Sequence, residues 1–261
     1  MIRLEPAGFL TLGTVRLEYQ FTGPLPDAAP TLVLLHEGLG SAGQWGQLPA
    51  ALARETGCGV LTYSRQGYGT SSPVPLPRPV DFLEREGHDA LPRVLTEVGF
   101  RRGILIGHSD GASIAALALT VRDPRICGGV LIAPHFFVEE ITLHGARKAK
   151  DAYETGDLRT RLAQRHADVE GAFRGWNDAW LDPARRDWNI CGALAKCSVP
   201  VLILQGTEDA YGTRAQIAVA QRALPLLLTV VELQGVGHEP HRDALSRSLS
   251  PMTKFIKRAL A

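Results

Sequence analysis

The 261-residue sequence predicts an α/β protein built on a mostly parallel central sheet. Short, almost continuous apolar runs recur along the chain, and runs of this kind are typical of parallel strands that are buried on both faces. Helical stretches separate most of these runs, and such alternation is typical of doubly wound α/β domains. One long interval contains no strand-like run, which predicts a helical insertion in the domain.

The elements follow in order along the chain. Residues 9–21 alternate between apolar and polar side chains, which predicts an N-terminal antiparallel hairpin. The later strands are expected at the apolar runs Leu32–Leu35, Val60–Tyr63, Ile104–Ile106, Val130–Ala133, Val201–Leu204 and Leu226–Leu233. The helices between them are expected at Trp45–Glu55, Val80–Val98, Ala112–Val121 and Ala215–Leu224.

The strandless interval covers residues 135–196. It contains two charged helical patterns, Ile141–Tyr153 and Leu158–Phe173, and the tryptophans Trp176, Trp180 and Trp188. Insertions at the carboxyl edge of such sheets often host ligands, so we expect a helical cap, or lid, here. Residues 1–134 and 197–261 would then form the core. A pair of extended surface helices is the alternative interpretation.

Composition excludes several classes of protein. Hydrophobic residues make up 45% and charged residues 21% of the chain, close to the globular average, so a disordered, collagen-like or disulfide-scaffold protein is excluded. The 28 basic and 27 acidic residues leave a net charge of +1, which argues against a nucleic-acid or acidic-membrane binder.

The sequence also suggests a compartment. No stretch approaches the roughly 20 apolar residues that span a bilayer, and the first residues lack the apolar region of a secretory signal. The four cysteines form no CxxC pair, so a zinc site is not expected. We therefore expect a cytoplasmic protein with reduced thiols.

The strongest local signal is Gly107-His108-Ser109-Asp110-Gly111, between an expected strand and an expected helix. In that position the pattern Gly-x-Ser-x-Gly predicts a nucleophile elbow, in which a strained turn projects the serine hydroxyl. The alternative is a glycine turn whose serine only caps the helix.

A serine hydroxyl needs a base to remove its proton. His238 follows the last expected strand, so it lies at the same sheet edge as the elbow and is the expected base. Pro240 places His241 inside the next helix, whereas His88, His144 and His166 are expected to be exposed. The spacing of His238 and His241 is also a faint metal pattern, but we expect no metal.

Asp209 follows the strand Val201–Leu204 and is the expected acid that orients the imidazole. Glu208 is the neighbouring alternative, and Asp123 lies in a turn before a strand, at the wrong edge. The order Ser109, Asp209, His238 is the order of an α/β-hydrolase triad.

Two backbone amides are expected to form an oxyanion hole. One is the amide of Asp110 at the helix start, and the other is the amide of Gly38 in the glycine-rich loop 36–41. One such donor contributes roughly 3 to 4 kcal/mol of transition-state stabilisation. A tight turn without a catalytic role is the alternative for the loop.

Together these segments resemble the α/β-hydrolase superfamily, in its lid-bearing, esterase-like branch. The resemblance spans nearly the whole chain and rests on five segments: His36–Gly40, Ser64–Ser71, Gly107–Gly111, Gly206–Asp209 and Gly237–His238. It implies the α/β-hydrolase fold and a hydrolase that needs no cofactor.

Two residues depart from the superfamily pattern. Glu37 stands where glycine is usual, and Asp110 stands where an apolar or amide side chain is common. A carboxylate facing the developing oxyanion would oppose catalysis. We therefore expect both acids to turn away from the hole and to order the loops, through His36 or Arg65.

The predicted function is hydrolysis of a small or medium carboxylic ester through an acyl-enzyme on Ser109. The alternatives are a C–C bond hydrolase, a thioesterase or a cofactor-free perhydrolase on the same triad, and a non-catalytic small-molecule receptor. Neither nucleic acid nor membrane is an expected partner, and a homodimer is compatible with the sequence. The substrate pocket is expected at His135, Phe136, Phe137, Trp176, Trp180 and Tyr211.

Overall fold

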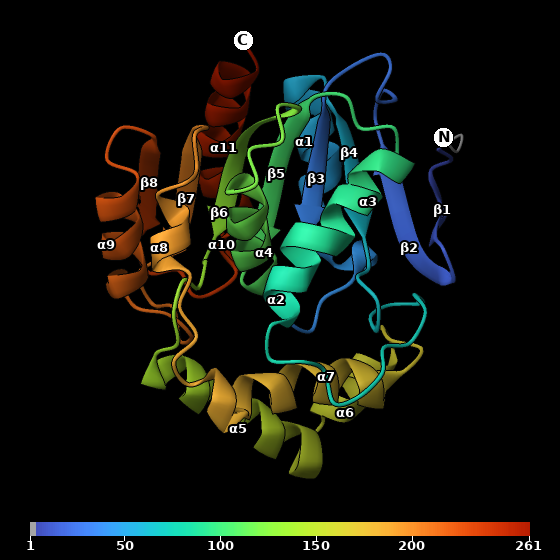
Figure 1. Ribbon diagram of the computed structural model, residues 1–261, viewed down its shortest axis with the longest axis vertical. Helices are drawn as coiled ribbons and strands as arrows, with labels where there is room; N and C mark the ends of the chain where they lie inside the picture. Colours follow the sequence, from blue (N-terminus) through green and yellow to red (C-terminus); the bar gives the residue numbers. More distant parts are fainter. Residues whose placement is uncertain (1–3) are drawn as a thin grey trace.

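A computed structural model describes residues 4–261 and contains one eight-stranded sheet (Figure 1). The strand order is β1-β2-β4-β3-β5-β6-β7-β8. Strand β2 pairs antiparallel with β1 and with β4, and all the other pairs are parallel. The strands are β1 (Ala7–Leu12), β2 (Val15–Thr22), β3 (Thr31–Leu35), β4 (Gly59–Tyr63), β5 (Gly103–His108), β6 (Ile126–Ile132), β7 (Val201–Gly206) and β8 (Leu228–Leu233). The expected fold class is confirmed.

Helices cover both faces of the sheet. In β5, Ile104 and Ile106 join the core beneath α1 and α11, whereas Leu105 joins the larger core beneath α2, α3 and α4. This burial on two faces explains why the parallel strands are apolar at successive positions. The flanking helices are α1 (Leu48–Thr56), α2 (Phe82–Arg85), α3 (Leu91–Glu97), α4 (Asp110–Leu119), α8 (Cys191–Leu194), α9 (Arg214–Ala223), α10 (Pro240–Asp243) and α11 (Leu245–Leu260).

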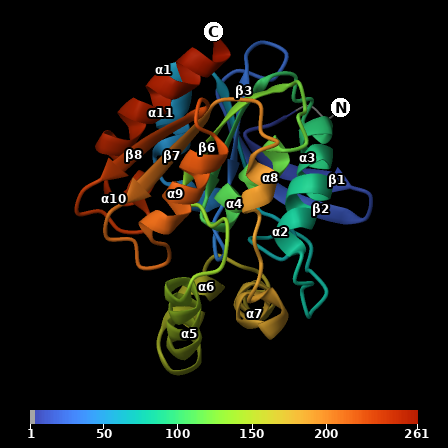
Figure 2. The same ribbon diagram turned by 60° about the vertical axis from the view of Figure 1, so that its left-hand side comes forward.

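Three further helices form a separate layer beyond the carboxyl ends of the strands (Figures 1 and 2). They are α5 (Glu140–Thr155), α6 (Leu158–Ala163) and α7 (Val169–Leu181), and they lie between β6 and β7 in the chain. Helix α8 instead packs against α9 and α4, and Phe136 lies in the core of the sheet. The layer beyond the sheet is therefore shorter than residues 135–196.

The expectation of one helix over Leu158–Phe173 is wrong. Helix α6 ends at Ala163 and α7 begins at Val169, because His166 between them turns toward the core while its neighbours stay exposed. His166 accepts a hydrogen bond from the Gly69 amide on Nδ1 (2.9 Å) and contacts the Leu39 carbonyl through Nε2 (3.0 Å). His166 is therefore buried rather than exposed, and it fixes the turn to two core loops.

The expected helix over Val80–Val98 is interrupted by a π-helical turn at Glu86–Ala90. A Cβ atom at Gly87 would lie 2.9 Å from the Leu117 Cβ, so this glycine allows the turn to approach α4 closely. Among residues 4–261, no helix combines the length and the apolar character needed to cross a bilayer. The four cysteines have free thiols.

Candidate active site

Ser109 lies at the turn between β5 and α4, with φ of 52° and ψ of −118°. A positive φ is strained for any residue with a side chain, and such strain is concentrated at functional sites. Close backbone packing holds the turn: a Cβ at Gly111 would overlap the Leu35 carbonyl, and the Ser109 amide donates to Ile132 (2.9 Å). The elbow geometry that the sequence predicts is therefore present.

Asp209 and His238 form a close pair. The His238 Nδ1 lies 2.8 Å and 2.9 Å from the two Asp209 carboxylate oxygens, which also accept from the Gln205 side chain (2.7 Å) and the Tyr211 amide (2.7 Å). Burial alone would raise the pKa of Asp209, but these hydrogen bonds, with His238 first, lower it to about 2. An ionised carboxylate accepts the Nδ1–H, so Nε2 of His238 is free to accept a proton.

The two alternative acids lie elsewhere. Asp123 forms an ion pair with Arg125 (2.6 Å) in the turn before β6, at the amino ends of the strands. The His238 ring is bonded to Asp209 and not to its neighbour Glu208.

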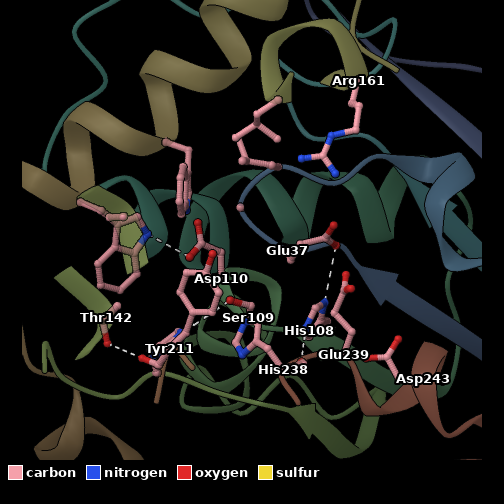
Figure 3. Close-up of a pocket in the computed structure, with 17 residues that line it drawn as sticks. Glu37, His108, Ser109, Asp110, Thr142, Arg161, Tyr211, His238, Glu239 and Asp243 are labelled. Atoms are coloured by element: carbon pink, nitrogen blue, oxygen red, sulfur yellow. Dashed lines mark hydrogen bonds and ion pairs between the residues drawn. The ribbon is translucent and has the colours of Figure 1, made fainter. Parts of the chain in front are cut away.

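A cavity of about 390 Å³ lies between the carboxyl edge of the sheet and helices α5–α7 (Figure 3). Ser109 and His238 both line it. The lining residues are Glu37, Gly38, Leu39, His108, Ser109, Asp110, His135, Thr142, Ala146, Leu158, Arg161, Trp176, Trp180, Tyr211, His238, Glu239 and Asp243.

Four of the six residues expected in the substrate pocket line this cavity: His135, Trp176, Trp180 and Tyr211. Phe136 and Phe137 do not, so that expectation is corrected. Phe136 is fully buried in the main core, and Phe137 packs against it beside a β-bridge to Asn189. The chain turns after β6, so only His135 of the three faces the cavity.

The amides of Gly38 and Asp110 are the candidate oxyanion donors. Both residues line the cavity, and within residues 4–261 neither amide donates to a protein acceptor. A Cβ at Gly38 would overlap the Trp176 indole, so only glycine fits there. The loop is held from beneath by buried Arg65, whose guanidinium donates to the carbonyls of His36 and Glu37 (3.0 Å for Glu37).

The Asp110 side chain contacts helix α7. Its Oδ1 accepts from the Trp180 indole N–H (3.0 Å), while Oδ2 is buried and has no partner in residues 4–261. Burial raises the pKa of Asp110, and the charges of Arg65 and Arg185 partly oppose this.

The Glu37 carboxylate lies 3.6 Å from the His108 Nδ1. Burial alone would raise the pKa of Glu37, but the interaction with His108 outweighs it and holds the pKa below its usual range. Glu37 thus reaches Arg65 and His36 through its backbone carbonyl, whereas its carboxylate is directed to His108.

Two histidines to which sequence patterns assigned no supporting role, His108 and His241, pack beside this site. The His108 Nε2 donates to the His238 carbonyl (2.9 Å), and its ring centroid lies 4.6 Å from that of His241. His241 is buried, and burial lowers its pKa to about 3, so it is uncharged. Within residues 4–261, no three His, Cys, Asp or Glu side chains are grouped as a metal site.

Comparison with known proteins shows the family of this chain. A profile of the alpha/beta hydrolase family matches residues 32–247. The human serine hydrolase BPHL is 28% identical over 206 residues, which cover 75% of this chain and 67% of that protein. The putative carbamate hydrolase RutD of Enterobacter cloacae is 37% identical over 233 residues, which cover 81% of this chain and 85% of that protein.

Solved structures show the same fold at low identity. A carboxylesterase structure from the thaumarchaeon Nitrososphaera gargenis has a TM-score of 0.79 at 17% identity and covers 97% of this chain and 99% of its own. An enol-lactonase from Burkholderia xenovorans has a TM-score of 0.73 at 22% identity, and the match covers 97% of this chain and 99% of the enol-lactonase. The chain belongs to the alpha/beta hydrolase family and is an enzyme, a serine hydrolase.

Proposed function

We propose that this enzyme cleaves a small or medium carboxylic ester through an acyl-enzyme on Ser109. The observation that carries the proposal is the strained Ser109 at a cavity that His238 also lines, with Asp209 behind the imidazole at 2.8 Å between Oδ2 and Nδ1. A nucleophile and an oriented base at one cavity are the requirements of covalent acyl transfer.

In the acylation step, Ser109 Oγ attacks the ester carbonyl carbon while His238 Nε2 accepts the hydroxyl proton. Asp209 holds the imidazole in the Nδ1–H tautomer and stabilises the imidazolium that forms. The amides of Gly38 and Asp110 donate to the oxyanion, and the dipole of α4 adds to this stabilisation.

The tetrahedral intermediate then collapses. His238 gives its proton to the leaving alkoxide, and the C–O bond of the ester breaks. Water next attacks the acyl carbon while His238 Nε2 accepts its proton, and the acid leaves as Ser109 regains its hydrogen.

The cavity limits the substrate by size and charge. A volume of about 390 Å³ suits a small or medium acyl group. Four carboxylates line the cavity, Glu37, Asp110, Glu239 and Asp243, and the last two form ion pairs with Arg242, which is not a lining residue. Arg161, the guanidinium in the lining, pairs with Asp157 (3.3 Å), so the acidic excess at the cavity rests on Glu37 and Asp110. This balance favours neutral or positively charged substrates over acids that carry a second negative charge.

Hydrolysis of nitrophenyl esters from acetyl to long acyl chains tests the proposal. Ser109→Ala should abolish turnover, and Ser246→Ala, at an exposed serine of α11, should leave it unchanged. Equal, slow rates in the wild type and in Ser109→Ala would refute the proposal.

Carbamate hydrolysis is a second candidate, supported by the 37% identity to the putative carbamate hydrolase. A carbamate presents the same kind of carbonyl to Ser109. A matched pair of nitrophenyl acetate and nitrophenyl N-methylcarbamate, compared by kcat/KM, would separate the two activities.

A further inference from the structure

His135 places a second imidazole at the nucleophile. Its Nε2 lies 3.5 Å from the Ser109 Oγ, and its ring centroid lies 5.8 Å from that of His238. The side chain lines the cavity and is only 2% exposed. A separation of 3.5 Å is at the outer limit of a hydrogen bond, and catalytic hydrogen bonds commonly shorten when substrate binds.

The backbone around His135 is held firmly. Ser113, one turn after Ser109 on α4, donates from its Oγ to the His135 carbonyl (2.6 Å) and accepts from the His135 amide (3.3 Å). The turn that delivers His135 contains Ala133 with φ of 48°, a strained value for a residue with a side chain. The helix that begins after the nucleophile therefore also fixes the position of His135.

The surroundings of His135 differ from those of His238. Within residues 4–261, no carboxylate is bonded to its ring, and Nδ1 is buried without a hydrogen-bond partner. Burial, and then the charge of His238, lower the pKa of His135 to about 3. A neutral imidazole of this kind is too weak a base to replace His238, but it can still donate one N–H.

The hydrogen-bond partners around His135 indicate which of its ring nitrogens carries the proton. A serine hydroxyl has one proton and two lone pairs, and the proton of Ser109 must point to His238 for the reaction to begin. A lone pair of Oγ is then left toward His135. The Nε2–H tautomer satisfies it and leaves only a bare acceptor at Nδ1, whereas the Nδ1–H tautomer would bury an unpaired donor.

We propose that neutral His135 donates its Nε2–H to the Ser109 Oγ and thereby positions the nucleophile, with the hydroxyl proton directed to His238. His135 is then a positioning residue that acts through Ser109. The same N–H stabilises the negative charge that develops on Oγ when the acyl group departs. This inference rests on the proposed function, in which Ser109 is the nucleophile.

Two substitutions separate positioning from packing. His135→Gln retains an N–H donor near the place of Nε2 but loses the ring, whereas His135→Phe retains the ring that meets Trp180 edge-on (centroids 5.5 Å apart) but loses the donor. The readouts are kcat and KM for a nitrophenyl ester, and the rate at which a fluorophosphonate labels Ser109. Thermal unfolding verifies that each variant is folded.

We expect His135→Phe to lower kcat and the labelling rate about tenfold, with a smaller change in KM, and His135→Gln to remain within about threefold of the wild type. A faster Phe variant than Gln variant would overturn the inference, and so would equal rates in the two.

A measurement on the unmodified enzyme is independent of the variants. A long-range ¹H–¹⁵N spectrum should show His135 protonated on Nε2 and unchanged between pH 5 and pH 9. Protonation on Nδ1 would overturn the inference.

The labelling also separates failure of this inference from failure of the proposed function. A wild type that is labelled but cleaves no ester contradicts only the proposed ester substrate. The labelling rates of the wild type and the two variants then still test the role of His135. A wild type that is not labelled contradicts both proposals.

Discussion

Replacing His166 by leucine should destabilise the protein by about 2 to 6 kcal/mol at pH 8. His166 is only 4% exposed and bonds to the Gly69 amide and the Leu39 carbonyl at 2.9 Å and 3.0 Å. Leucine fills the space but leaves the buried Gly69 amide and the partly buried Leu39 carbonyl without their partner, which costs about 1 to 3 kcal/mol for each group.

The stability that His166 contributes should also depend on pH. Since the Gly69 amide donates to Nδ1, the imidazole must be neutral, and burial lowers the pKa of His166 in the folded protein. The unfolded chain then binds a proton more readily, so the stability contributed by His166 is present above the unfolded pKa of 6.5 and is lost as the pH falls below it. At pH 5.5 this loss reaches up to about 1.4 kcal/mol.

Urea unfolding of the wild type and His166→Leu at pH 8 and pH 5.5 measures both effects. The difference in unfolding free energy should be large at pH 8 and smaller at pH 5.5. His144→Leu, at an exposed histidine of α5, is the matched control and should show neither effect. If the wild type and His166→Leu unfold with the same free energy at pH 8, or differ equally at both pH values, the proposed role of His166 is refuted.

Three further predictions concern the elbow, the triad and the pocket. Gly111→Ala should prevent folding, because the added Cβ overlaps the Leu35 carbonyl, while Gly192→Ala has open space and should leave soluble expression unchanged. Asp209→Asn should lower kcat about 1,000-fold or more with little change in KM, since the amide favours the wrong tautomer of His238; a kcat within tenfold of the wild type would exclude this role. In an ester series matched in size, a succinyl monoester should react at least about tenfold more slowly than a butyryl ester, and Glu37→Gln should narrow that gap; equal kcat/KM values for the two esters would contradict the charge argument.

The parts of the fold that follow from local pattern were predictable from the sequence. The continuous apolar runs at β3 and β5 identify strands because both of their faces are buried. The elbow was predictable because the Gly-x-Ser-x-Gly pattern is local, although only Gly107 is required by nearby backbone, at Gly111 and Ala112, while Gly111 is required by the distant Leu35 carbonyl.

Features that depend on distant contacts were not predictable. The break between α6 and α7 arises because His166 bonds to loops 97 and 127 residues earlier in the chain. The partner of Asp110 is Trp180, and the partner of Glu37 is His108, and both pairings join segments that meet only in the folded chain. Phe136 was misplaced because periodicity cannot show which way a side chain points after a strand ends.

The arrangement of the strands also bears on how the enzyme acquires activity. Gly38, Ser109, His135, Asp209 and His238 follow five different strands, and those strands, β3, β5, β6, β7 and β8, are consecutive neighbours in the sheet. The reacting groups therefore meet only after contacts between sequence-distant segments have formed, which are the slow contacts in folding. During refolding we expect helical circular dichroism to recover first and hydrolysis last, so turnover itself reports that the sheet is complete from β3 to β8.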